Sequence, residues 1–225
     1  MTFSIVGRCG RTGMFGVAIT TSSICVGARC PHVRAGVGAV ATQNVTDPAL
    51  GPMLLDLMAR GVPAPDAVKA IVAGRAHIDY RQLTAVDAAG RVGHHTGGRI
   101  LGTHAEVEGV DCMAAGNLLS STAVPRAMAE AFAAHSGKHL GDRLLTALEA
   151  GQAAGGEEGP THSAALLVAD KQPFPLVDLR CDWDDEDPVK VLRRLLSDYT
   201  PQMQAYLDRA VNPTAAPSYG VPGDE

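Results

Sequence analysis

The order of strand-like and helix-like segments is the feature that most constrains how this chain can fold. Apolar runs typical of strands come in pairs around short turns, and two pairs of helix-like segments separate these blocks. A parallel sheet would need strands and helices to alternate one by one. The block order therefore predicts an α+β fold, in which antiparallel sheets and helices form separate layers.

The predicted elements start with a hairpin of strands 2–7 and 14–21, followed by a Gly-rich strand over 36–43 that is buried on both faces. After Asn212 the tail 213–225 is rich in Pro and Gly and is predicted to be disordered, so residues 1–212 are predicted to form a single domain. The remaining predicted strands are 81–88, 91–96, 110–115, 163–169 and 175–181, and the predicted helices are 48–60, 63–74, 122–135, 139–153, 187–198 and 201–210.

Small residues make up much of the apolar content, because the chain has 25 Gly and only 4% aromatic residues. Scarce aromatics disfavour binding of single-stranded nucleic acid by stacking. The formal net charge is −5 and no basic cluster is present, which also argues against a nucleic-acid partner. No apolar run is long enough to cross a membrane, and the first residues lack the pattern of a signal peptide. We therefore expect a cytoplasmic protein with no membrane partner.

The residue that we single out for catalysis is Thr2. Initiator methionine is usually removed before a small second residue, which would make Thr2 the free N-terminus. An N-terminal Thr carries a hydroxyl nucleophile and an α-amine whose pKa of about 7.7–8.0 suits a base near neutral pH. Thr2 also starts an apolar strand, which would hold it rigidly. Arg34, just before the strand 36–43, is predicted to lie beside Thr2 and to keep the amine neutral.

Several motifs of the chain resemble those of one family. They include TFSIV at 2–6, AGVGAVATQ at 35–43, AVDAAGRV at 85–92, GNLL at 116–119, EAGQAAGG at 149–156 and SAALLV at 163–168. Through these motifs the chain is similar, over about residues 2–198, to the family known as domain of unknown function 1028, which is placed in the N-terminal-nucleophile (Ntn) hydrolase superfamily. The resemblance implies a four-layer αββα sandwich of two packed antiparallel sheets, and hydrolysis of amide or other C–N bonds.

The resemblance also implies roles for individual residues. Thr2 matches the nucleophile and base of the superfamily, and Arg34 falls where proteasome-like members keep a Lys. Thr21 and Ser22 fall near an acidic residue of those members. No carboxylate is present at that place in the sequence, so hydroxyl groups would have to orient the amine. Asn117 suits an oxyanion-stabilising role, because its side-chain amide can donate to a tetrahedral intermediate.

Gln43 and Asn44 end a buried strand and are predicted, with His95, to contact the substrate. Together these residues predict an Ntn-type amidohydrolase that cleaves an amide, ureide or lactam bond of a small molecule. The alternative is a non-catalytic protein on the same fold that binds a small molecule or serves in assembly. The Ala- and Gly-rich helical surfaces permit close packing, so we expect a homo-oligomer in either case.

Two other kinds of catalytic site remain open. The five cysteines show no paired spacing, so neither a disulfide framework nor a CxxC metal pair is predicted. A cysteine nucleophile would be Cys25 or Cys30 paired with His32 or His162, although a small Cys in such a segment is more often part of the core. A zinc site lacks a known spacing, and adjacent histidines on a strand point to opposite faces, so we expect no metal or other cofactor. Its candidate ligands would be His94, His95, His104, Glu106 and Asp111.

Overall fold

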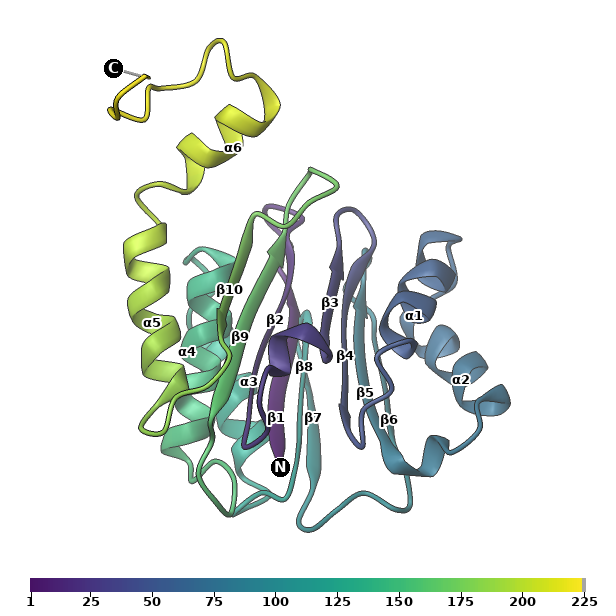
Figure 1. Ribbon diagram of the computed structural model, residues 1–225. Helices are drawn as coiled ribbons and strands as arrows, with labels where there is room; N and C mark the ends of the chain where they lie inside the picture. Colours follow the sequence, from purple (N-terminus) through teal and green to yellow (C-terminus); the bar gives the residue numbers. More distant parts are fainter. Residues whose placement is uncertain (224–225) are drawn as a thin grey trace.

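Two antiparallel sheets face each other in the centre of the molecule (Figure 1). The structure is a computed structural model, and it describes residues 1–223. The six-stranded sheet has the order β10-β9-β2-β1-β8-β7, and the four-stranded sheet has the order β3-β4-β5-β6. The strands are β1 (Thr2–Arg8), β2 (Phe15–Thr21), β3 (Pro31–Arg34), β4 (Gly38–Asn44), β5 (Arg81–Asp87), β6 (Val92–Thr96), β7 (Ala105–Gly109), β8 (Cys112–Asn117), β9 (Ser163–Ala169) and β10 (Val177–Cys181).

Helices cover the outer face of each sheet (Figure 1). The six-stranded sheet is covered by α3 (Val124–Ala134), α4 (Leu140–Ala153) and α5 (Pro188–Tyr199), whereas α1 (Leu50–Ala59) and α2 (Ala64–Gly74) cover the four-stranded sheet. The layers therefore run helix, sheet, sheet, helix. This confirms the predicted α+β sandwich of two packed antiparallel sheets.

The structure contains two strands that the sequence pattern did not predict, so residues 1–223 hold ten strands rather than eight. Both are edge strands: β3 borders the four-stranded sheet and β7 borders the six-stranded sheet. Short edge strands commonly carry charges and proline, which protect the sheet from further pairing. The Pro-His-Val-Arg and Ala-Glu-Val-Glu-Gly sequences of these two strands follow this rule and therefore lack an apolar pattern.

Alternation along the central strand β1 supplies two different layers of the core. Phe3 and Ile5 pack with the helices of the six-stranded side. Ser4 and Val6 face the other way, toward the four-stranded sheet, as the period of two along a strand requires. A side chain at Gly16 would collide with Leu144 of α4, which shows how the small residues let a helix approach the sheet closely.

The space between the sheets is filled unevenly. At the end where β1 finishes and β2 starts, apolar side chains of the two sheets pack against each other and form one buried cluster. At the opposite end, where β1 begins, polar side chains take their place. The apolar cluster consists of Val6, Phe15, Val17, Ala39, Ala41, Val86 and Met113.

Helix α6 (Met203–Val211) continues beyond α5 and projects away from the sheets (Figure 1). The predicted tail, 213–225, follows directly. Its residues 213–223 contain no helix and lie beside α6, where the Arg209 guanidinium donates to the carbonyl oxygens of Pro217 and Ser218. Residues 224 and 225 lie outside the described residues. Within residues 1–223, none of the helices has both the length and the apolar character needed to cross a membrane.

Candidate functional site

Polar side chains line up across the six-stranded sheet where β1 begins. The register pairs Thr2 with Thr21 on one side and with Asn117 on the other. Residues paired in this way face the same side of a sheet. That side is the one toward the four-stranded sheet, because the hydroxyl of Ser4, two residues along β1, donates to Gln43 Oε1 at 2.6 Å. Thr2 is therefore buried in the space between the two sheets.

The hydroxyl groups of Thr2 and Thr21 meet at one point. Their Oγ1 atoms are 3.0 Å apart, and Thr2 Oγ1 donates to the carbonyl oxygen of Met1 at 2.5 Å. The Thr21 hydroxyl donates to the same carbonyl oxygen. The side chains are only 5% and 3% exposed. Two buried hydroxyl groups thus converge on the carbonyl group that directly precedes Thr2.

A network of side-chain amides joins this point to the opposite sheet. Gln82 Nε2 donates to the carbonyl oxygen of Gly116 at 3.2 Å, and because a carbonyl can only accept, this bond fixes which way the Gln82 amide points. Gln82 Oε1 then accepts from Gln43 Nε2 at 2.8 Å and from Asn117 Nδ2 at 3.2 Å. Gln43, predicted to contact substrate, is thereby held beside Ser4 in the wall of the site.

This network changes the expected role of Asn117. One N–H of its NH₂ group donates to Gln82 Oε1, and its Oδ1 atom is buried without a hydrogen-bond partner. Asn117 therefore lies beside Thr2, as expected, but one of its two N–H donors is committed to Gln82 and its unpaired atom is an acceptor, whereas an oxyanion needs a donor. The direction of this amide is set by Gly116 and by Gln82 in the other sheet, which no local pattern around Asn117 reveals.

A carboxylate that the sequence analysis missed lies in the same place. Glu157, in the loop between α4 and β9, is 7% exposed and neither carboxylate oxygen has a hydrogen-bond partner. Burial raises the pKa of Glu157 to about 8, and the nearby Met1 amine and the Ser22 backbone N–H partly lower it without completing a hydrogen bond. The sequence has no carboxylate next to Thr21 and Ser22, and the structure brings one near Ser22 from a distant part of the chain.

The loop that carries Glu157 is held by its backbone. Residues 119 and 157 form an isolated bridge, and Glu158 N–H donates to the Leu118 carbonyl oxygen at 3.0 Å. Gly155 and Gly156 adopt φ values of +115° and +57°, which favour glycine. The Gly-Gly pair before two glutamates is the sequence signal that marks this loop as having a defined shape.

The structure does not bring Arg34 to Thr2. Arg34 pairs with Gly38 at the start of β4, whereas Gln43, which contacts Ser4, lies five residues further along the same strand. Five residues of an extended strand span about 17 Å. The Arg34 side chain is 41% exposed and forms a 2.8 Å ion pair with Asp56. The expectation failed because residues 31–34 form strand β3, which carries Arg34 toward the far end of the sheets.

Asn44 and His95 also have other contacts. Asn44 has a φ of +72°, and its amide donates to the Tyr80 carbonyl oxygen at 2.8 Å and accepts from Leu101 N–H at 3.3 Å. The amide thus joins loops. The neighbour of His95, Thr96, faces Gln82 between the sheets, so His95 itself points to the outer face, 3.3 Å from the Ile78 carbonyl oxygen. His95 therefore does not face the polar site.

The geometry gives little support to a cysteine nucleophile or to a metal site. Burial raises the pKa of the Cys30 thiol and lowers the pKa of His32, so both groups favour their neutral forms. His94 lies 3.9 Å from Glu106. Across the part of the chain that the structure describes, no group of three or more His, Cys, Asp or Glu side chains is placed to hold a metal ion.

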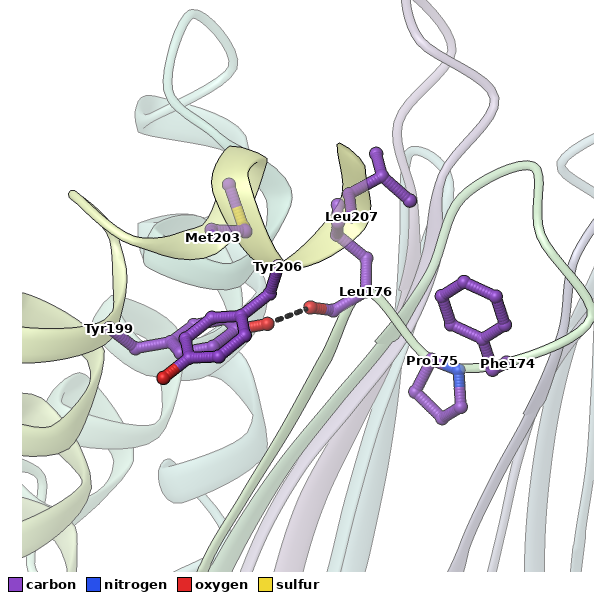
Figure 2. Close-up of a pocket in the computed structure, with 7 residues that line it drawn as sticks. All are labelled: Phe174, Pro175, Leu176, Tyr199, Met203, Tyr206 and Leu207. Atoms are coloured by element: carbon purple, nitrogen blue, oxygen red, sulfur yellow. Dashed lines mark hydrogen bonds between the residues drawn. The ribbon is translucent and has the colours of Figure 1, made fainter. Parts of the chain in front are cut away.

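An apolar cavity of about 310 Å³ lies elsewhere, between α6 and the segment that precedes β10 (Figure 2). It adjoins the Ala169 end of β9, whereas Thr21 pairs with Ser163 at the other end of that strand. The cavity is therefore remote from Thr2, and no charged side chain lines it. Its lining residues are Phe174, Pro175, Leu176, Tyr199, Met203, Tyr206 and Leu207.

Comparisons with known proteins agree on a family but not on a function. The chain is similar to the crystal structure of protein SPO2555 from Silicibacter pomeroyi, with 33% identity, a TM-score of 0.82, and coverage of 88% of this chain and 86% of that one. Anbu (ancestral beta-subunit) from Yersinia bercovieri is 11% identical over 91% of this chain and 97% of that one, but its TM-score of 0.39 supports no argument about this chain. No curated protein matches. The model of a family of unknown function, DUF1028, matches residues 2–192, and the chain therefore belongs to this family.

Proposed function

We propose that the protein is an Ntn-type amidohydrolase that cleaves a C–N bond of a small molecule, with Thr2 as its nucleophile after Met1 has been removed. The observation that carries the proposal is the buried pair of hydroxyl groups on Thr2 and Thr21, which both donate to the carbonyl oxygen just upstream. Removal of Met1 leaves the two hydroxyl groups in place, adds a free amine to Thr2, and empties the space that Met1 occupied.

Thr2 and water account for every bond change and proton transfer of the reaction. Thr2 Oγ attacks the substrate carbonyl carbon while the α-amine of the same residue takes the hydroxyl proton, directly or through one water. The C–N bond then breaks, the leaving nitrogen takes the proton from the Thr2 ammonium, and an ester remains on Thr2. Water attacks this ester, the amine takes a proton from the water, and Thr2 Oγ leaves and is protonated again.

Thr21 replaces Asn117 as the donor to the oxyanion in this proposal. The Met1 carbonyl stands in for a substrate carbonyl, and the Thr21 hydroxyl donates to its oxygen. Losing one such donor typically raises the reaction barrier by about 2.7–4 kcal/mol. Asn117 Oδ1, buried and unpaired beside Thr2, is placed to accept from the free Thr2 amine and so to orient it.

The test measures hydrolysis of a panel of small amides, lactams and ureides by protein whose N-terminus has been confirmed as Thr2. Thr2→Ala is expected to abolish turnover and to keep the fold, as judged by circular dichroism. Thr21→Ala is expected to lower kcat by about 10²–10³. Thr20→Ala is the matched control, because Thr20 precedes Thr21 on β2 and its hydroxyl donates to a backbone carbonyl, that of Ser163.

Equal activity of Thr2→Ala and the unmodified protein would overturn the proposal. Binding of a panel compound without any turnover would instead favour the alternative of a non-catalytic protein on the same fold. The two results are separated by titration calorimetry beside the activity assay.

A further inference from the structure

Each part of Met1 has a counterpart in the protein. Its carbonyl oxygen accepts from the hydroxyl groups of Thr2 and Thr21. Its α-amine lies close enough to Glu157 to lower the pKa of that carboxyl group. Its side chain reaches the loop at Gly159, where an added Cβ atom would come within 3.1 Å of the terminal methyl carbon of Met1. Met1 thus lies in a site that has hydroxyl groups at its carbonyl oxygen, the Gly159 loop at its side chain and the buried Glu157 carboxyl group near its amine.

Loss of Met1 leaves a buried carboxyl group in this site without a neighbouring cation. With the methionine present, Glu157 is 7% exposed and neither oxygen of its carboxyl group has a hydrogen-bond partner, and loss of Met1 takes away the nearby amine. The departing amine was one of the two groups that lowered its pKa. A buried carboxylate without a partner is costly to ionise, and a cation in the vacated place removes that cost.

We propose that the site recognises substrates whose acyl group carries a free α-ammonium, such as α-amino acid amides, and that they bind as Met1 does. This inference rests on the proposed function and names its substrate class. The substrate ammonium meets Glu157, its side chain lies over Gly159, and its carbonyl carbon lies at the Thr2 hydroxyl with the carbonyl oxygen at Thr21. Glu157 is therefore the residue that determines specificity for the ammonium group.

The free amine of Thr2 is a poorer partner for Glu157. A carboxylate beside that amine would raise the pKa of the amine and keep it protonated, which opposes its work as a base. Thr2 already has an unpaired acceptor in register with it, Asn117 Oδ1. When the Thr2 amine donates to Asn117 Oδ1 and the substrate ammonium donates to the Glu157 carboxyl group, both buried groups obtain a hydrogen-bond donor.

The test compares three amides on full-length protein whose mass shows that Met1 is absent: L-methioninamide, its N-acetyl derivative and its analogue without the amine. Ammonia release is the readout. We expect methioninamide to have the highest kcat/KM, and Glu157→Gln to lower that value by about 100-fold while the analogue without the amine changes by less than about 3-fold. Glu158→Gln is the matched control, because Glu158 is the exposed neighbour of Glu157.

The outcomes separate the inference from the proposed function. Thr2-dependent hydrolysis without preference for the ammonium group keeps the proposed function and overturns the inference. Equal loss for all three amides in Glu157→Gln would assign Glu157 to the Thr2 amine and would also overturn it. Calorimetric binding of methioninamide to Thr2→Ala that is lost on adding Glu157→Gln supports the inference even where no amide is cleaved.

A second variant covers the case in which Glu157→Gln does not fold. An added methyl group at Gly159 narrows the space that the Met1 side chain fills. Gly159→Ala is therefore expected to shift the ratio of kcat/KM toward L-alaninamide and away from L-methioninamide by about 10-fold. An unchanged ratio would mean that the substrate side chain does not lie over Gly159, and this would contradict the proposed binding mode.

Discussion

The two ends of the space between the sheets are built from the same strands but have opposite character. At one end Val6, Val17 and Met113 belong to a buried apolar cluster. At the other, Ser4 and Gln43 are joined by a buried hydrogen bond. Ser4 and Val6 are two residues apart on β1, about 7 Å along the strand. The change from apolar core to polar site therefore takes place between two residues, Ser4 and Val6, that face the same way on one strand.

The comparison shows a division of work. The apolar end stabilises the contact between the sheets by burying surface. The polar end gains little stability, because its groups only exchange water for one another, and it leaves Asn117 Oδ1 and Glu157 without partners. Neighbouring polar groups that are buried without partners are typical of functional sites. Under the proposed function, the apolar end holds the sheets in place and the polar end receives the ligand.

The largest expected loss of stability lies at the apolar end. Phe15 is 2% exposed, and Phe15→Ala leaves a cavity that should cost about 3–5 kcal/mol of unfolding free energy, measured by urea denaturation. The rate per folded molecule at Thr2 should stay within about 2-fold, because independent distant sites do not couple strongly. A specific loss of activity at unchanged stability would break the division between the two ends.

The next effect concerns the pH dependence of stability and depends on Glu157. Its pKa is about 8 in the folded protein against an ordinary value of 4.5. Between these pH values the folded chain keeps a proton that the unfolded chain has lost, so stability falls as pH rises, by at most about 1.4 kcal/mol per pH unit. Glu157→Gln should remove this decline, which thermal melts at pH 5 to 8 would detect. An equal decline in Glu157→Gln and Glu158→Gln would place the cause elsewhere.

A loss of stability of the same order, with a larger effect on activity, is expected for the amide network. Gln82→Met removes the partner of Gln43, Asn117 and the Gly116 carbonyl oxygen. Each buried group left unpaired costs about 1–3 kcal/mol, less any relief from new contacts with water. The Asn117 amide is then free to turn, so kcat should fall more than stability implies. Full activity in this variant would show that the network does not position the site.

The smallest effect is expected at Arg34, which lies at the far end of the sheets in an exposed pair with Asp56. Exposed ion pairs contribute at most about 1 kcal/mol, so Arg34→Ala should leave both melting temperature and turnover nearly unchanged. A large loss of turnover in this variant would restore the sequence-based prediction that Arg34 assists Thr2.

The sequence predicted those parts of the protein that depend on local pattern. Alternating and buried apolar runs located the long strands, and the position of Thr2 at the start of a paired strand followed from the first hairpin. The prediction placed Arg34 beside Thr2 because the short edge strand β3 has no apolar pattern from which it could be predicted. Glu157 was missed because its loop comes close to Met1 and Ser22 only when the chain is folded. The direction of the Asn117 amide depends on a residue in the other sheet.

The central claim is that the polar end holds an N-terminal nucleophile, and the mature N-terminus tests it most directly. Intact mass and N-terminal sequencing of the purified protein should show a chain that lacks the mass of one methionine residue and begins at Thr2. A chain that retains Met1 would contradict the account. In that chain the α-amine is one residue away from the hydroxyl, and the Met1 carbonyl occupies both the Thr2 and Thr21 hydroxyl groups.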